Sequence, residues 1–131
     1  MAVSAKAEER VAAALTALLP GNAPLCVAFS GGLDSTVLLA LLRRVCSDRQ
    51  LRAVHVDHGL QPDSGLWAEH CQEQCDALGV PFLLLRAKVQ TTSGESLEAS
   101  AREARYAALA DELAAEEWLV TAHHQQDQLE T

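Results

Sequence analysis

The sequence predicts an α/β protein built on a doubly wound parallel sheet. Short apolar segments alternate along the chain with longer segments whose apolar residues recur at helical spacing. The short segments are apolar runs and do not alternate with polar residues, as expected for strands that are covered on both faces. Glycine and polar residues gather in the turns that follow these segments, where parallel sheets bind ligands.

The predicted elements follow one another without an obvious linker. Strands are expected at residues 25–29, 51–56, 81–85 and 118–122, and helices at 3–19, 34–46, 64–78 and 95–117. Pro20-Gly21 and Gly79 supply helix stop signals. A further helix is expected to begin at residue 125, so we expect a fifth strand beyond Thr131. On this view residues 1–131 form a single N-terminal domain that is incomplete at its C-terminal end.

Charge and hydropathy restrict the class of protein. Acidic residues outnumber basic ones by 18 to 10, and the sequence has no tract of basic residues. This segment alone is therefore a poor candidate for contact with a phosphate backbone, and any nucleic acid would be held mainly by elements outside it. No apolar stretch approaches the roughly 20 residues of a membrane span. Charged residues occupy the N-terminal region where a secretion signal would be apolar, so we expect a cytoplasmic protein without membrane contact.

The cysteines have two interpretations. Cys71 and Cys75 lie four residues apart, which places both on one helical face, and His70 adjoins them. A zinc site would need a further pair of ligands at suitable spacing, and the sequence lacks it. We therefore expect a packed helix face.

The strongest chemical signal is the stretch Ser30-Gly31-Gly32-Leu33-Asp34-Ser35, which follows a predicted strand and opens a predicted helix. Glycines let the backbone approach an anion closely, and a helix N-terminus offers free N–H groups. Asp34 beside a polyphosphate would require a cation between them. The pattern therefore predicts a site for a Mg²⁺-bound nucleotide, and a plain turn with a helix cap is the simpler alternative.

This loop resembles the pyrophosphate-binding loop of the N-type ATP pyrophosphatases, the PP-loop superfamily. Within it, three further stretches resemble the tRNA(Ile)-lysidine synthetase family: HVDHGL at 55–60, EASAREARY at 98–106 and HHQQDQLET at 123–131. The motifs occur in the family's order and cover nearly the whole chain. The resemblance implies a Rossmann-like sheet of the adenine nucleotide alpha-hydrolase type.

The resemblance also implies a set of site residues. Those expected to bind ATP are Ser30, Gly31, Gly32, Leu33, Asp34, Ser35, His55 and His58. Those expected to be catalytic are Asp34, Arg102 and Asp127, of which the two aspartates are also the expected Mg²⁺ ligands. We rank Arg102 above Arg105 because Glu98, one helical turn earlier, is placed to hold it.

Spacing alone leaves two of these assignments open. His55, Asp57 and His58 are equally typical of turn and capping residues. The Glu98 and Arg102 pair is equally typical of a solvated, salt-bridged helix face.

The last motif departs from the family pattern at one position. The family usually has His-x-Asp-Asp-Gln-x-Glu-Thr, and this chain has Gln126 in place of the first Asp. A neutral amide holds a hard cation less tightly than a carboxylate does. We expect Asp127 to carry the functional contact, because adjacent side chains at a helix start point in different directions. The alternative is a damaged site.

The resemblance implies an ATP-dependent ligase that adds free lysine to the wobble cytidine of tRNA(Ile). Related thiolases and amidating synthetases share the loop, but the thiolases' Cys-x-x-Cys pairs are missing here. A non-catalytic ATP-binding module is a second alternative. A third is a serine hydrolase with Ser30, Asp57 and His123 as its triad, although Asp34 would oppose the developing oxyanion.

Overall fold

A computed structural model describes residues 6, 9–10, 13–14, 17, 22–46, 49–59, 64–88 and 96–122. Within these ranges one parallel sheet has the strand order β3-β2-β1-β4. Its strands are β1 (Leu25–Ala28), β2 (Leu51–Asp57), β3 (Phe82–Arg86) and β4 (Trp118–Thr121). The helices that alternate with them are α2 (Leu33–Val45), α3 (Ser64–Leu78) and α4 (Leu97–Glu112). The predicted α/β fold class is confirmed.

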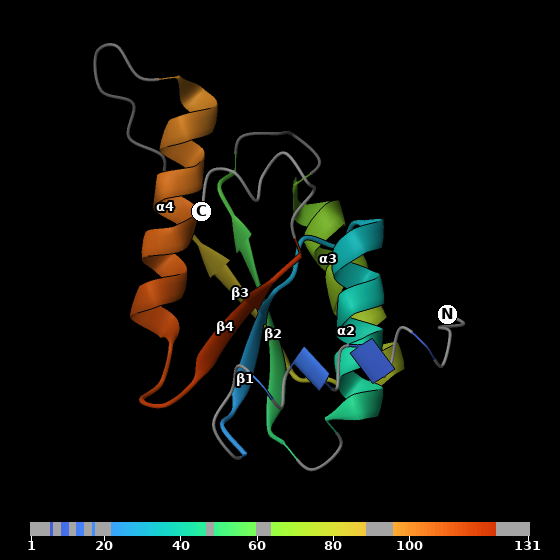
Figure 1. Cartoon of the computed structure of the whole chain (residues 1–131). Helices are drawn as coiled ribbons and strands as arrows, with labels where there is room; N and C mark the ends of the chain where they lie inside the picture. Colours follow the sequence, from blue (N-terminus) through green and yellow to red (C-terminus); the bar gives the residue numbers. More distant parts are fainter. Residues whose placement is uncertain are drawn as a thin grey trace.

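Helices cover both faces of the sheet, with α2 and α3 side by side on one face and α4 on the other (Figure 1). Alternate β1 residues serve the two layers. Leu25 and Val27 pack in a cluster that also holds Leu39 and Leu42 of α2. Cys26 belongs instead to the cluster that contains Leu109 of α4. Burial on both faces explains why β1 is apolar at all four positions and why the buried positions of β2 are Ala53, Val54 and Val56.

Cys71 and Cys75 pack against the sheet, as expected for a buried helix face. Both side chains are fully buried and belong to the core cluster beneath α2 and α3. Burial disfavours a thiolate, and it raises the pKa of Cys71 to about 11 and that of Cys75 to about 12. Both cysteines are therefore neutral core residues at physiological pH.

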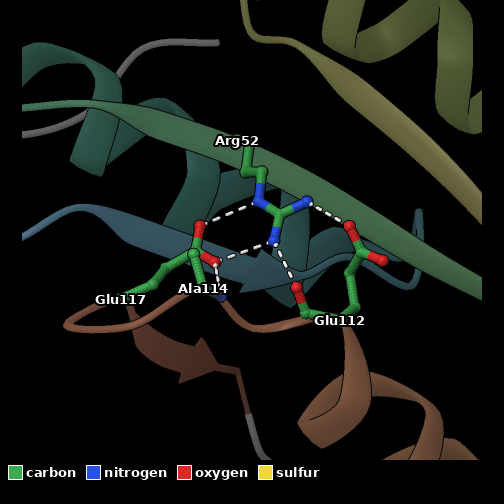
Figure 2. A network of polar contacts seen from close by, with 4 residues as sticks. All are labelled: Arg52, Glu112, Ala114 and Glu117. Carbon is green, nitrogen blue, oxygen red and sulfur yellow. Dashed lines mark hydrogen bonds and ion pairs between the residues drawn. The ribbon is translucent and has the colours of Figure 1, made fainter.

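The end of α4 corrects the sequence prediction. The helix ends at Glu112 and not at 117, and Glu116 adopts the left-handed region with φ of 69°. Arg52 of β2 accounts for the difference (Figure 2). Its guanidinium donates to the Glu112 carbonyl oxygen and carboxylate at 3.1 and 2.8 Å. It also donates to both carboxylate oxygens of Glu117, at 2.8 and 2.7 Å. The helical propensity of the Ala- and Glu-rich segment is thus overridden by tertiary contacts.

The described positions between 6 and 17 are helical, in agreement with the predicted first helix, whose other residues lie outside the described ranges. Among the described helices, none has the length and apolar character needed to cross a membrane.

Candidate functional site

The strand order locates the site. β1 lies between β2 and β4, so the chain leaves β1 toward one side of the sheet and later returns to its other side. Ligands of open parallel sheets bind beyond the carboxyl ends of the strands at such a reversal. The loop from Ser30 to Ser35 follows β1, and Asp57–Gly59 ends β2 and begins the next turn. The third turn expected from the sequence, 123–127, lies outside the described residues.

A cavity of about 430 Å³ occupies this end of the sheet. Such a volume is typical of small-molecule sites. The loop after β1, the end of β2, one face of α4 and the end of β4 all contribute to it. Its lining comprises Ala28, Phe29, Ser30, Gly32, Leu33, Asp34, Ser35, Val54, His55, Val56, His58, Arg105, Tyr106, Leu109, Thr121 and Ala122.

Hydrogen bonds between its two serines hold the loop in shape. The hydroxyls of Ser30 and Ser35 lie 2.9 Å apart, and the Ser30 N–H donates to Ser35 Oγ at 3.2 Å. The Gly32 N–H donates to Ser30 Oγ at 3.2 Å. The first N–H groups of an α-helix have no intrahelical acceptor. In α2 these groups belong to the same loop, so its backbone presents donors where the positive end of the helix dipole lies.

Gly31 satisfies two requirements that only glycine meets. Its φ is 82°, in the left-handed region. A Cβ added there would lie 2.6 Å from Cys71 Sγ, a distance at which something must shift. Backbone conformation and close packing on α3 therefore both demand glycine at this position.

Leu33 and Asp34 are exposed at the start of α2 and line the cavity. Asp34 is the loop's only carboxylate, and the other expected metal ligand, Asp127, lies outside the described residues. Within the described ranges, no group of three or more His, Cys, Asp or Glu side chains could hold a metal ion. The donor set suits Mg²⁺, which takes few protein carboxylates and keeps phosphate oxygens and water as its other ligands.

His55 and Asp57 at the end of β2, and His58 after it, divide between the two roles that their spacing left open. Asp57 is a turn residue, since its Oδ1 accepts the Gly59 N–H at 2.8 Å. His55 Nδ1 lies 2.9 Å from the Phe29 carbonyl oxygen. A carbonyl only accepts, so this nitrogen carries the proton and Nε2 is an acceptor. His55 and His58 both line the cavity.

His58 has an unusual environment. Its Nδ1 is buried without a hydrogen-bond partner among the described residues. Burial, and then the positive charge of Arg105, hold its pKa below the ordinary value of 6.5. The imidazole is therefore neutral at pH 7, with a polar atom that a ligand can satisfy.

Helix α4 presents Arg105 and Tyr106 to the cavity, and the Arg105 guanidinium lies 5.2 Å from the Tyr106 ring centroid. Arg102, which the sequence ranks first, is an exposed residue that is not among the cavity lining. The geometry thus brings Arg105 together with the loop and His58.

The sequence analysis missed Trp67 of α3. Its indole Nε1–H donates to the Ser30 carbonyl oxygen at 2.7 Å, so it touches the loop directly. The only available sequence signal was a tryptophan on a predicted helix, and that signal does not specify a partner.

Comparison with known proteins identifies the family. Residues 3–131 match the PP-loop domain. The chain belongs to the PP-loop family. Membership implies ATP binding, and it confirms the superfamily that the SGGLDS loop indicated. It also speaks against the serine hydrolase alternative.

Curated relatives are named tRNA(Ile)-lysidine synthase. The chain is 55% identical to that of Alkalilimnicola ehrlichii, over 94% of this chain and 28% of the relative. It is 49% identical to that of Haemophilus influenzae strain PittGG, over 80% of this chain and 25% of the relative. The chain thus spans about a quarter of the length of these relatives.

Two solved structures share the fold at low identity. An NH3-dependent NAD synthetase from Campylobacter jejuni superposes with a TM-score of 0.70 at 15% identity, over 95% of this chain and 56% of that one. The U34-tRNA thiolase NcsA from Methanococcus maripaludis gives 0.68 at 17% identity, over 93% of this chain and 46% of that one.

Proposed function

We propose that this domain binds and activates ATP in a tRNA(Ile)-lysidine synthetase, a cytoplasmic ligase whose substrates are tRNA(Ile), free lysine and ATP. The observation that carries the reaction is the 55% identity to a protein of that name over 94% of the chain. The observation that carries the placement of ATP is the cavity that joins the loop after β1 to His58 and Arg105.

The proposed chemistry has two steps. The O2 atom of the wobble cytidine attacks the α-phosphorus of ATP, and the bond to the β-phosphate oxygen breaks to release pyrophosphate. The lysine amine then attacks C2 of the cytosine, loses a proton, and displaces AMP. Both steps require stabilisation of phosphate charge, and neither requires a nucleophile from the protein.

The loop supplies that stabilisation. The Ser30 and Ser35 hydroxyls and the N–H groups at the start of α2 would donate to the pyrophosphate portion of the nucleotide. Asp34, with Asp127, would hold Mg²⁺, which neutralises charge on the phosphates when bound. Leu33, His55 and His58 would line the remainder of the nucleotide site. Arg105, which lines the cavity, would add positive charge beside the phosphates, and Arg102 remains a candidate catalytic residue outside the lining.

The test is an assay of the complete gene product with MgATP, lysine and a tRNA(Ile) transcript that has cytidine at the wobble position. Pyrophosphate release should depend on tRNA, and labelled lysine should enter the tRNA. Release that depends instead on ammonia or a sulfur donor would assign the domain to an amidating synthetase or a thiolase.

A matched pair of variants assigns Asp34. Asp34→Asn should slow pyrophosphate release by about 100-fold or more, because the cation loses a charged ligand at the reacting phosphates. Asp111→Asn removes another exposed aspartate, on α4 outside the cavity lining, and should leave the rate unchanged. Equal rates for the two variants would exclude Asp34 from the metal site.

A further inference from the structure

Trp67 reaches the loop from outside the cavity. It lies on α3, is 45% exposed, and lines a smaller cavity of about 210 Å³ beside the larger one. Its Nε1–H donates to the Ser30 carbonyl oxygen at 2.7 Å, a short bond for an N–H donor. The edge of its ring also closes over Gly31, since a Cβ built there would lie 3.2 Å from Trp67 Cζ2.

We propose that Trp67 is a positioning residue that holds the Ser30–Gly31 peptide in the orientation that binds phosphate. The inference rests on the proposed function, because it requires the loop to bind the phosphates of ATP. It adds a residue from a different helix to that site, one that acts through the loop backbone and does not line the larger cavity.

Peptide geometry explains why a fixed carbonyl matters. A trans peptide holds its C=O and N–H in opposite directions. The indole therefore fixes the Gly31 N–H on the side of the peptide facing away from Trp67. Glycine accepts either sign of φ, so Gly31 itself offers little resistance to rotation of this peptide. A rotated peptide would turn a carbonyl oxygen, which repels anions, toward the side from which the N–H would donate.

The surroundings keep the indole in place. The Trp67 ring contacts the His70 ring, one turn further along α3, with centroids 4.7 Å apart and the ring planes tilted by 34°. Cys71, which is fully buried on the same helix, packs against Gly31. The Trp67 N–H donor thus belongs to a helix that packs on the sheet, and contacts from Trp67 and Cys71 join this helix to the loop after β1.

The test compares one substitution at two tryptophans. Trp67→Phe keeps an aromatic ring against Gly31 and His70 but removes the N–H donor. Trp118→Phe is the matched control, because Trp118 is 43% exposed and lies at the amino end of β4, away from the loop. Binding of pyrophosphate and of MgATP is measured by titration calorimetry, and urea unfolding is measured for both variants.

Trp67→Phe should weaken pyrophosphate and MgATP binding by about tenfold, the equivalent of one net hydrogen bond. Its unfolding midpoint should stay close to that of Trp118→Phe, which should bind like the unsubstituted protein. Equal affinities in the two variants would overturn the role of Trp67 and leave the proposed function standing. No binding of either ligand by the unsubstituted protein would overturn both.

A second measurement tests the role of Trp67 in the unsubstituted protein. The indole N–H signals of Trp67 and Trp118 are resolved by NMR and assigned with the control variant. Pyrophosphate should slow hydrogen exchange of the Trp67 indole N–H by several-fold and leave that of Trp118 unchanged. Unchanged exchange at Trp67 on a loop saturated with pyrophosphate would contradict the proposal.

Discussion

The two ends of the sheet use charged and polar groups in opposite ways. At the amino end, Arg52 is paired with Glu112 and Glu117, and the Ala114 N–H donates to Glu117 Oε1 (Figure 2). At the carboxyl end, Arg105 lies near His58, a second group of the same potential charge, and the His58 Nδ1 has no partner among the described residues.

This difference links the amino end of the sheet to stability and the carboxyl end to ligand binding. Glu117 is almost fully buried, with a side chain 6% exposed, and its bonds to Arg52 hold its pKa below the ordinary value. Such a network is complete without a ligand and fixes the α4–β4 connection. At the other end, an anion would interact favourably with the Arg105 guanidinium that lines the cavity and with the N–H groups at the start of α2. We therefore expect substitutions at the two ends to change different measured quantities.

The largest effect is expected at Gly31. Gly31→Ala forces a Cβ to within 2.6 Å of Cys71 Sγ at a φ of 82°, so the loop must move. We expect MgATP affinity to fall by about 100-fold or more, because the loop's donors would no longer converge on phosphate. Calorimetric titration with MgATP measures this loss.

Gly59 supplies the matched control for that substitution. Its φ is 67°, but a Cβ added there would meet nothing within 4 Å. Gly59→Ala therefore imposes similar backbone strain without a collision and outside the larger cavity. If it weakened MgATP binding as much as Gly31→Ala, strain alone would be responsible and the packing of the loop on α3 would be irrelevant.

The next effect is expected at the amino end, in stability alone. Arg52→Met leaves the buried Glu117 carboxylate without its partner, which should lower the free energy of unfolding by about 2–3 kcal/mol. Arg86→Met removes an exposed arginine from β3 and should cost no more than about 0.5 kcal/mol. Urea unfolding measures both. MgATP affinity should be unchanged, and a parallel loss of affinity in Arg52→Met would show that the two ends are coupled.

The sequence was sufficient for the fold and for the loop after β1. Continuous apolar runs predicted the buried strands, and the SGGLDS pattern specified the loop because only glycine tolerates the backbone geometry at Gly31. Arg52 and Trp67 escaped prediction for the same reason. Each acts on a partner distant in sequence, Glu117 in one case and Ser30 in the other, and local patterns carry no record of such contacts.

The choice between Arg102 and Arg105 shows a second limit of sequence reasoning. Both residues lie near the face of α4 that carries the buried Leu109, because they precede it by seven and four positions. Helical phase therefore does not separate them. Their positions along the helix axis do separate them, because Arg102 lies about 10 Å from Leu109 and Arg105 about 6 Å. Only the placement of α4 on the sheet shows which of the two reaches the cavity.

The smallest effect concerns the pKa of His58. Burial lowers it most, and the charge of Arg105 lowers it further. Unfolded His58 takes up a proton near 6.5 and the folded residue does so at lower pH, so the native state loses stability as pH falls below 6.5. Arg105→Met should move the pKa partway back toward 6.5 and make this loss smaller, while Arg102→Met should do so less. NMR titration of the His58 ring protons measures the shifts.

Pyrophosphate should also raise the pKa of His58, because an anion in the cavity stabilises the charged imidazole. A His58 pKa that pyrophosphate leaves unchanged would mean that the anion binds elsewhere, and the contrast between the two ends of the sheet would then have no functional meaning.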